Sequence, residues 1–436
     1  MLVRKTPQAA AATWQNITPP VGWTWDLPFN IQKLGSSYRV DPTFNLKTYA
    51  GITVTKTYWV KMASEGGSDG ASGADEAHAF ATIGFAISRA DVDCVMIKAG
   101  TYTGYPSSQG WHGAGAVRSC QVIGYGGPVI SAIDIVTSII TWSLVGNHYE
   151  GTYATSVGGI RDSSNLDVYG DEIPLALAAD VASCDAAANS WWRNAGVLYV
   201  HTFDGRSPDA NIKISIGTAN GAMTAAITQY IEGISFHGGS GPAFNASLAG
   251  NGIKLYCKNC NFKNSSWWGT QDTFNITGGG GEVILQGCVS ARGNGDAFKA
   301  QFSGAYVSNL AMIDCIGRYS GAVGNTNSNG YSRHGPGSTV AINTEFHHTY
   351  GPSMRDVNDG TLAWLLGCYA HDSLAAEGSN ENFSCDNGTI IWLDGCRSVR
   401  AGNNDLVATA ATGKIYYRNM TPANPTHAGG GTFAAY

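Results

Sequence analysis

The second half of the chain repeats one short pattern at intervals of 23 to 30 residues. Each unit combines a short β-type run, a turn rich in Gly and Asn, and one anchor residue expected to point inward. Repeats of this length are typical of solenoids, in which a coil buries its apolar face only against its neighbours. Because the units are too short and too rich in Gly and β-branched residues for helix pairs, they predict a parallel β-helix. We assign the anchors as Ile234, Cys260, Cys288, Cys315, Glu345, Cys368 and Cys396, with Met420 as an eighth candidate.

Five of these anchors are cysteines. Adjacent coils lie about 4.8 Å apart, yet side chains stacked in parallel rarely reach the torsion angle that a disulfide requires. We therefore expect the anchor thiols to be free and buried. Cys257 and Cys260 form a CxxC pair without a second pair or a ligand His nearby, so we expect no zinc site there.

The composition argues against several classes of function. A net charge of −6 and a pI near 5.9 leave no basic stripe to bind nucleic-acid phosphates. The sequence has no apolar run of about 18 residues, so we expect no membrane insertion. The first residues lack the apolar core of a secretion signal, which favours assembly in a cytoplasm. The sequence has no strong metal motif, and a Ca²⁺ cofactor would be expected only for a lyase.

The chain divides into four segments. Residues 1–57 lack the repeat and form a Pro- and Trp-rich arm, interpreted either as an attachment segment or as a cap folded on its own body. Residues 58–130 are expected to hold a capping helix and the first coils. Residues 131–228 contain alternating runs that predict a β-rich insertion, and residues 229–436 form the main β-helix and a tail.

The entry to the repeat carries a second signature. A Gly-Ser-Asp loop precedes an amphipathic helix expected over 77–90, and a strand VMIKA follows and ends in Ala99–Tyr102. This text resembles the N-terminal entry of pectate-lyase-like right-handed β-helices. The resemblance implies a helix that covers the open end of the apolar stack. The predicted fold is therefore a right-handed parallel β-helix with an N-terminal capping helix and an antiparallel β insertion. The helix positions that carry the resemblance are Phe80, Thr82, Ile83, Ala86 and Ile87.

The coils from Gly295 to Asp405 resemble, more narrowly, β-helix proteins of tailed phages and prophages. The matching text includes GNGDAFKA and the run from SRHGPG to LDGCRS. Such proteins are commonly tailspikes, so the resemblance implies a homotrimeric virion spike that binds host-surface polysaccharide and often depolymerises it. It also implies contacts with other virion proteins through residues 1–57. The chemistry of this family varies, so its catalytic residues do not transfer to this chain.

Acidic residues recur 8 to 12 positions after the anchors. At equivalent positions of a solenoid they would form a file along one face. Asp side chains at bends often accept backbone N–H groups, and we interpret Asp272 and Asp405 as such turn caps. The other two, Asp296 and Asp356, are the better candidates for catalysis because basic residues lie around them.

Two chemistries fit this file. Two coils separate Asp296 from Asp356, which gives about 9–10 Å if they share a column. That separation is near the upper end for inverting glycoside hydrolases. Elimination from a uronic acid instead needs a base and a cation, roles open to Lys299, His334 and Arg355. All five residues are predicted to be catalytic, and the sequence does not choose between hydrolase and lyase.

A further set of residues is predicted to bind substrate. The HD pair after the Cys368 anchor could line one side of a groove, and the tandem tryptophans could serve as sugar platforms. These candidates are Arg333, His371, Asp372, Glu377, Trp267 and Trp268. Glu345 departs from the apolar anchors, which indicates either a buried, hydrogen-bonded carboxylate or a coil that bulges outward.

The sequence therefore favours a virion spike that binds and depolymerises surface polysaccharide. One alternative is a free-standing bacterial polysaccharide lyase or glycoside hydrolase, which would act outside the cell. The other is a non-catalytic structural or adhesive β-helix of a virion, in which the Asp file serves only turns.

Overall fold

The structure is a computed structural model. It describes residues 13–436 with gaps at 104–108, 136, 154, 217–218, 240, 249–251, 266–270, 303–305, 322–326, 359, 375–380, 403, 421–424 and 427–430. Among these residues no helix is long and apolar enough to cross a membrane.

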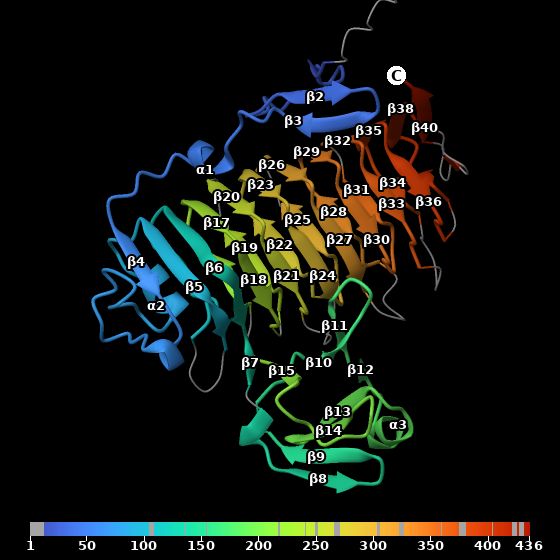
Figure 1. Ribbon diagram of the computed structural model, residues 1–436. Helices are drawn as coiled ribbons and strands as arrows, with labels where there is room; N and C mark the ends of the chain where they lie inside the picture. Colours follow the sequence, from blue (N-terminus) through green and yellow to red (C-terminus); the bar gives the residue numbers. More distant parts are fainter. Residues whose placement is uncertain are drawn as a thin grey trace, which may run out of the picture.

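The chain folds into an elongated parallel β-helix, which confirms the predicted fold class (Figure 1). Most coils add one strand to each of three parallel ladders. The first ladder is the nine-stranded sheet of β16 (Gly221–Met223), β19 (Phe244–Leu248), β22 (Phe274–Gly278), β25 (Phe298–Phe302), β28 (Tyr331–His334), β31 (Met354–Val357), β34 (Phe383–Cys385), β37 (Leu406–Ala408) and β39 (Pro425–Thr426).

The other two ladders complete the coils. The second ladder contains β17 (Thr228–Glu232), β20 (Ile253–Lys258), β23 (Gly281–Gln286), β26 (Ser308–Ile313), β29 (Gly337–Ile342), β32 (Thr361–Leu366), β35 (Ile390–Asp394), β38 (Lys414–Arg418) and β40 (Thr432–Ala435). The third contains β18 (Ile234–His237), β21 (Asn261–Lys263), β24 (Val289–Gly293), β27 (Ile316–Ser320), β30 (Glu345–His347), β33 (Tyr369–His371) and β36 (Arg397–Val399).

A bend in the left-handed region separates the second ladder from the third. Gly, Asn or Asp occupies this bend because these residues tolerate positive φ best. The anchor residue follows directly and points into the core. The bend residues are Gly233, Asn259, Gly287, Asp314, Asn343, Gly367, Gly395 and Asn419.

This bend corrects one anchor. Asn343 has a φ of 49°, so the inward residue after it is Thr344 and not Glu345 as we predicted. Glu345 pairs in register with Ile316 and Tyr369, and its side chain is 36% exposed. The Thr344 hydroxyl donates to the carbonyl of Met312 at 3.2 Å, much as the thiols of the neighbouring coils contact carbonyls.

The cysteines of the chain are all free and buried, which confirms the expected ladder of thiols. Cys315 Sγ, for example, lies 3.4 Å from the carbonyl oxygens of Leu285 and Ile313. A stack of aromatic rings lines the same core, with Phe244 and Phe274 stacked at 5.8 Å between centroids. The interior is therefore continuous from coil to coil.

The capping helix is shorter than predicted. α2 spans only Ile83–Ile87, while the sequence indicated 77–90. Asp69 Oδ1 accepts the N–H groups of Ala81 and Thr82 at 3.0 Å each, and Phe80 forms a β-bridge to Val60, so the chain stays extended up to the helix. The helix packs beside β4 (Thr57–Val60), β5 (Cys94–Tyr102) and β6 (Cys120–Ala132) at one end of the solenoid (Figure 1).

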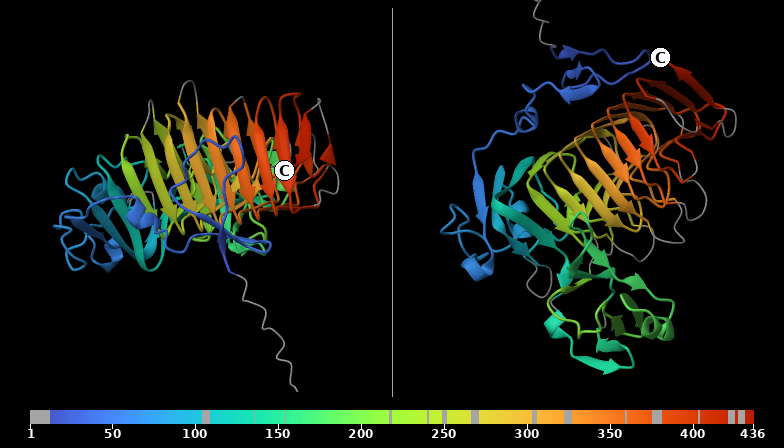
Figure 2. Two further views of the ribbon diagram at one scale, coloured as in Figure 1. Left: turned by 90° about the horizontal axis from the view of Figure 1, so that it is seen from above. Right: turned by 45° about the vertical axis from the view of Figure 1, so that its right-hand side comes forward.

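The insertion forms two small, mainly antiparallel sheets with their own apolar core. One sheet contains β7 (Asp134–Ile135), β10 (Gly159–Leu166), β11 (Glu172–Pro174) and β15 (Ile212–Ser215). The other contains β8 (Trp142–Val145), β9 (His148–Thr152), β12 (Ala176–Leu177), β13 (Ser190–Asn194) and β14 (Val197–His201), with α3 (Val181–Ala186) beside it. Figure 2 shows the insertion standing off one side of the solenoid.

The β10–β11 loop ties the insertion to the third ladder. Asp171 pairs with Lys263 at 2.6 Å and with Arg318 at 2.7 Å, and Asp167 pairs with Arg292. Tyr169 lies on the Arg318 guanidinium, 4.8 Å from ring centroid to Cζ. This contact holds the loop against the solenoid.

The N-terminal arm packs along the second ladder of its own chain (Figures 1 and 2). It contains β1 (Gln15–Asn16), β2 (Ile31–Leu34), β3 (Ser37–Val40) and α1 (Leu46–Tyr49). Trp23 meets Trp364 edge-on at 5.9 Å, and Tyr38 Oη donates to Asp394 Oδ1 at 2.6 Å. The described part of this segment therefore packs on the body of its own chain.

Candidate functional site

A groove with a volume of about 500 Å³ lies along the first ladder, over β25, β28 and β31 and the loops that precede them. Four of the five residues predicted to be catalytic line it: Asp296, Lys299, His334 and Arg355. We call this feature the groove. The structure therefore brings four of the predicted residues together in one groove, although they are spread over 60 positions of the chain.

Strand register explains how these residues meet. Lys299, Ser332 and Arg355 are Cα partners on three successive coils, and Gln301, His334 and Val357 form the next outward column. Side chains of a strand alternate between the two faces of the sheet. Equivalent positions of the solenoid thus become a linear row on its outer surface.

Asp296 stands at the start of this row. Its Oδ1 accepts the backbone N–H of Asn329 at 2.7 Å and the Asn329 side-chain amide at 2.9 Å, and its Oδ2 accepts the Ser332 hydroxyl. Burial, reinforced by the nearby Asp272 carboxylate, raises the pKa of Asp296 to about 7. At neutral pH this group can therefore hold and release a proton.

Asp272 is the acidic neighbour on the preceding coil. Its Oδ1 accepts the backbone N–H of Asp296 at 3.0 Å, so the predicted turn-capping role is confirmed. Its Oδ2 lies 3.2 Å from Lys299 Nζ, which leaves a salt bridge facing the groove. Burial raises the pKa of Asp272, and Lys299 opposes that shift.

His334 and Arg355 occupy the opposite part of the groove. Burial, with smaller contributions from the charges of Lys299 and Arg355, lowers the pKa of His334 to about 4. The imidazole is therefore neutral at physiological pH. Arg355 lies 3.8 Å from Asp386, and its buried Nε has no hydrogen-bond partner among the described residues. That donor is buried in this geometry, while the Arg355 side chain as a whole is 24% exposed and lines the groove.

Two predicted residues lie inside the solenoid instead. Arg333 and Asp356 are Cα partners on β28 and β31, and each is fully buried. Arg333 donates to the carbonyls of Ser308, Pro336 and Ser338 at 2.6, 2.9 and 3.2 Å. Arg333 cannot bind substrate as predicted, because side chains alternate along β28 and that of Arg333 points into the core, away from the groove.

Asp356 is not in the file of Asp272 and Asp296. It sits two residues after the inward Met354, whereas the other two precede inward Phe residues by two. Burial raises the pKa of Asp356 to about 7, while Arg333 opposes that shift. Neither carboxylate oxygen has a hydrogen-bond partner in the described part of the chain. Asp405, the remaining member of the predicted file, accepts from Ser398 Oγ at 2.6 Å.

The remaining predicted residues do not join the groove. Trp267, Trp268 and Glu377 lie outside the described residues. His371 and Asp372 lie at β33 in the third ladder, where their side chains contact each other at 2.6 Å. They belong to a separate cluster on another side of the solenoid.

Sequence reasoning missed Asn329 and Ser332, which hold the Asp296 carboxylate. A signal was present: Asp272, Asp296 and Asn329 each stand two residues before an inward aromatic ring. Counting from the inward residue that opens each strand, which is Met354 in the strand of Asp356, predicts the correct file and removes Asp356 from it.

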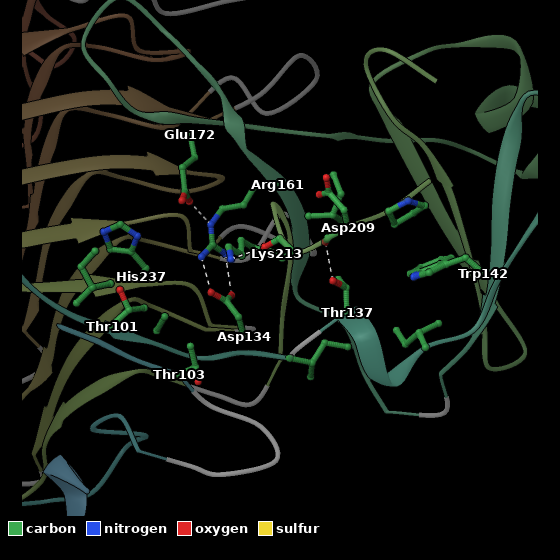
Figure 3. Close-up of a pocket in the computed structure, with 17 residues that line it drawn as sticks. Thr101, Thr103, Asp134, Thr137, Trp142, Arg161, Glu172, Asp209, Lys213 and His237 are labelled. Atoms are coloured by element: carbon green, nitrogen blue, oxygen red, sulfur yellow. Dashed lines mark hydrogen bonds and ion pairs between the residues drawn. The ribbon is translucent and has the colours of Figure 1, made fainter. Parts of the chain in front are cut away.

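A second cavity of about 450 Å³ lies between the insertion and the solenoid (Figure 3). Arg161 crosses its floor and pairs with Asp134 at 2.5 Å and with Glu172. Burial lowers the pKa of the nearby His237 to about 4. The charges on this floor satisfy one another, and much of the wall is apolar, so the cavity offers fewer open polar groups than the groove.

No family model matches this sequence, and no curated protein matches it. Three solved structures are similar in fold. XylC in complex with xylose is 12% identical (TM-score 0.43), covering 83% of this chain and 65% of that one. Pectate lyase Pel9A is 13% identical (0.45), covering 87% and 80%. The tailspike protein gp49 of Pseudomonas phage LKA1 is 11% identical (0.27), covering 81% and 70%. The chain thus spans just under two thirds of XylC, and these likenesses concern the fold alone.

Proposed function

We propose that the groove binds an acidic polysaccharide and cleaves it, with Asp296 as the proton donor. The observation that carries this proposal is the pKa of Asp296, raised to about 7, in a groove that also presents two cations and a neutral imidazole. Titratable groups with perturbed pKa values in one cleft are typical of catalytic sites. The partly exposed guanidinium of Arg355 adds donors that a bound sugar can satisfy.

The arrangement supports β-elimination. Lys299 and Arg355 flank a position where the carboxylate of a uronic acid would be neutralised, which makes the adjacent C–H more acidic. Neutral His334 then accepts that proton, a C=C bond forms, and the glycosidic C–O bond breaks. Asp296 donates its proton to the leaving oxygen. General acid and base groups of this kind each contribute about 10²–10⁴-fold to rate.

Hydrolysis is the second candidate, and the neighbouring carboxylates favour it. Asp272 and Asp296 lie on adjacent coils, about 4.8 Å apart along the stack. This is the spacing of the backbones; retaining glycosidases hold their two carboxyl groups about 5–5.5 Å apart, a separation that side chains on adjacent coils can adopt. Here Asp272 would be the nucleophile and Asp296 the acid. This pair replaces the pair of Asp296 and Asp356 predicted from the sequence.

A panel of capsular and exopolysaccharides tests the proposal. Elimination produces unsaturated uronate, seen by ultraviolet absorbance, together with new reducing ends, whereas hydrolysis produces reducing ends alone. The Asp296→Asn variant should lose activity on the polysaccharide that the wild type cleaves. If no polysaccharide is cleaved, the protein is a non-catalytic β-helix whose carboxylates serve turns only. If the variant retains full activity, Asp296 is not the proton donor and the proposed mechanism is wrong.

The biological setting we propose is a virion spike that recognises host-surface polysaccharide, assembled in the host cytoplasm. Its support is the resemblance of residues 295–405 to phage β-helix proteins. A homotrimer and contacts with other virion proteins through residues 1–57 belong to this proposal. Light scattering that finds a stable monomer of 45.8 kDa would count against the trimer and favour a free-standing enzyme acting outside the cell.

A further inference from the structure

A histidine cluster lies on the outer side of the third ladder. His347 on β30 and His371 on β33 are Cα partners on adjacent coils. Their rings are stacked at 4.8 Å between centroids with an interplanar angle of 3°. Glu345 precedes His347 by two residues and therefore shares its outward face. Its Oε1 lies 2.8 Å from His371 Nε2.

The outer nitrogens of both rings are already held by neighbours. His371 Nδ1 lies 2.6 Å from Asp372 Oδ2, and Arg400 in turn holds Asp372 at 2.6 Å. His347 Nδ1 lies 2.6 Å from His348 Nδ1. These contacts fix the orientation of each ring and turn its Nε2 toward the side where Glu345 lies, and His371 Nε2 contacts Glu345 there. A carboxylate on the second nitrogen of a histidine is the usual outer shell of a metal ligand.

We propose that Glu345, His347 and His371 form a binding site for a divalent transition metal of the zinc type. Their donor atoms lie within 4.8 Å of one another, so small side-chain movements bring them around one ion. Two imidazoles and one carboxylate suit Zn²⁺, which prefers N and O donors at about 2.0–2.2 Å. Hard cations such as Ca²⁺ and Mg²⁺ prefer oxygen donors and fit this set poorly.

The surroundings are compatible with a cation. A guanidinium in register is that of Arg318, a Cα partner of His347; Asp171, which also pairs with Lys263, holds it at 2.7 Å. Tyr169 of the insertion lies 5.0 Å from the His347 ring and shields one side of the cluster. Three protein ligands leave a fourth position for water, as in zinc sites with an open coordination position. The site is independent of the groove and of the function proposed there.

Titration of the chelator-treated full chain with Zn²⁺ tests the site. Isothermal calorimetry should show one ion bound per chain, and the Tm should rise with Zn²⁺ but not with Mg²⁺ or Ca²⁺. Co²⁺ bound here should give the visible absorption of a four-coordinate site. Glu345→Gln keeps the shape of a half-exposed side chain and should weaken Zn²⁺ binding at least about tenfold, as should the outer-shell variant Asp372→Asn.

His78→Gln is the matched control, because His78 is exposed and lies far from the cluster in the sequence, where it pairs with Asp75. It should bind Zn²⁺ as the wild type does. The proposal is overturned if Zn²⁺ neither binds nor raises the Tm, which would mean that His371 simply bridges two carboxylates. Equal Zn²⁺ affinity in the wild type, Glu345→Gln and Asp372→Asn would also overturn it, since the ion would then bind elsewhere.

Discussion

The two faces of β28 and β31 carry different chemistry on neighbouring residues. On the outside, His334 and Arg355 line the groove, and Arg355 keeps an unpartnered donor. On the inside, Arg333 and Asp356 are fully buried among the coils. A shift of one position along a strand therefore separates a group that can meet a ligand from one that shapes the core. In this fold the role of a charged residue depends on whether its position along the strand faces outward or inward, and two adjacent residues face opposite sides.

The largest expected effect concerns the interior. Arg333→Met leaves several buried carbonyls without a donor and removes the guanidinium that is paired in register with Asp356. Breaking a buried charged network typically costs about 3–5 kcal/mol. Urea unfolding should show a loss of this size. The outward control Arg355→Met should change the free energy of unfolding by less than about 1 kcal/mol. Equal losses in both variants would contradict the division into two faces.

The next effect concerns turnover. Asp296→Asn removes the proton donor of the groove and should lower the rate of polysaccharide cleavage at least about a hundredfold. Asp356→Asn is the matched control, because that carboxyl group faces the interior and should leave the rate unchanged. Initial rates on the cleaved polysaccharide measure both. A large loss in Asp356→Asn with a normal Tm would restore the role predicted for it from the sequence.

The sequence predicts the inward and outward positions of a coil only when they are counted from the right residue of that coil. The Gly, Asn and Asp residues at the bends made the solenoid recognisable in the sequence, because few other residues adopt positive φ without strain. The same bend at Asn343 would have placed Thr344 in the core. Asp356 was assigned by its distance from an anchor, but loops of different length precede each strand of the first ladder. Only the inward apolar residue that opens each strand, such as Phe298 or Met354, shows which positions of that strand face outward.

The docking of the insertion could not be predicted at all. Its contacts join Asp171 to Lys263 and Arg318, residues 92 and 147 positions away. In the sequence, nothing distinguishes these three charged residues from others that lie on the surface. The histidine cluster was equally hidden, because Glu345 had been assigned to the core and the pairing of His347 with His371 depends on strand register.

A smaller effect is expected in the pH dependence of cleavage. Elimination requires neutral His334 and protonated Asp296, so kcat/KM should be highest between about pH 4 and about pH 7. Outside this window it should fall about tenfold per pH unit. Arg355→Met removes a cation that lowers the pKa of His334, so the acid limb should move to higher pH. An unmoved acid limb would favour hydrolysis by Asp272 and Asp296.

The smallest expected effect is on the pH dependence of stability. It distinguishes the contribution of Asp356 from that of Asp296, the other carboxyl group with a raised pKa. The pKa of Asp356 is about 7 in the folded chain against an ordinary value of 3.8, so the unfolded chain releases this proton first. Stability attributable to Asp356 is therefore present below about pH 4 and is lost as the pH rises toward 7.

Asp356→Asn cannot ionise, so it should match the wild type at pH 3.5 and be the more stable protein at pH 8, by a few degrees in Tm, as a pKa raised from 3.8 to about 7 implies for a chain of this length. Asp296 contributes a slope of the same sign, so part of the pH dependence should remain in this variant. Thermal melts of both proteins across this pH range provide the measurement. Parallel curves would mean that Asp356 is ionised in the folded state and paired with Arg333, and the interior of these coils would then hold a salt bridge instead of a neutral acid.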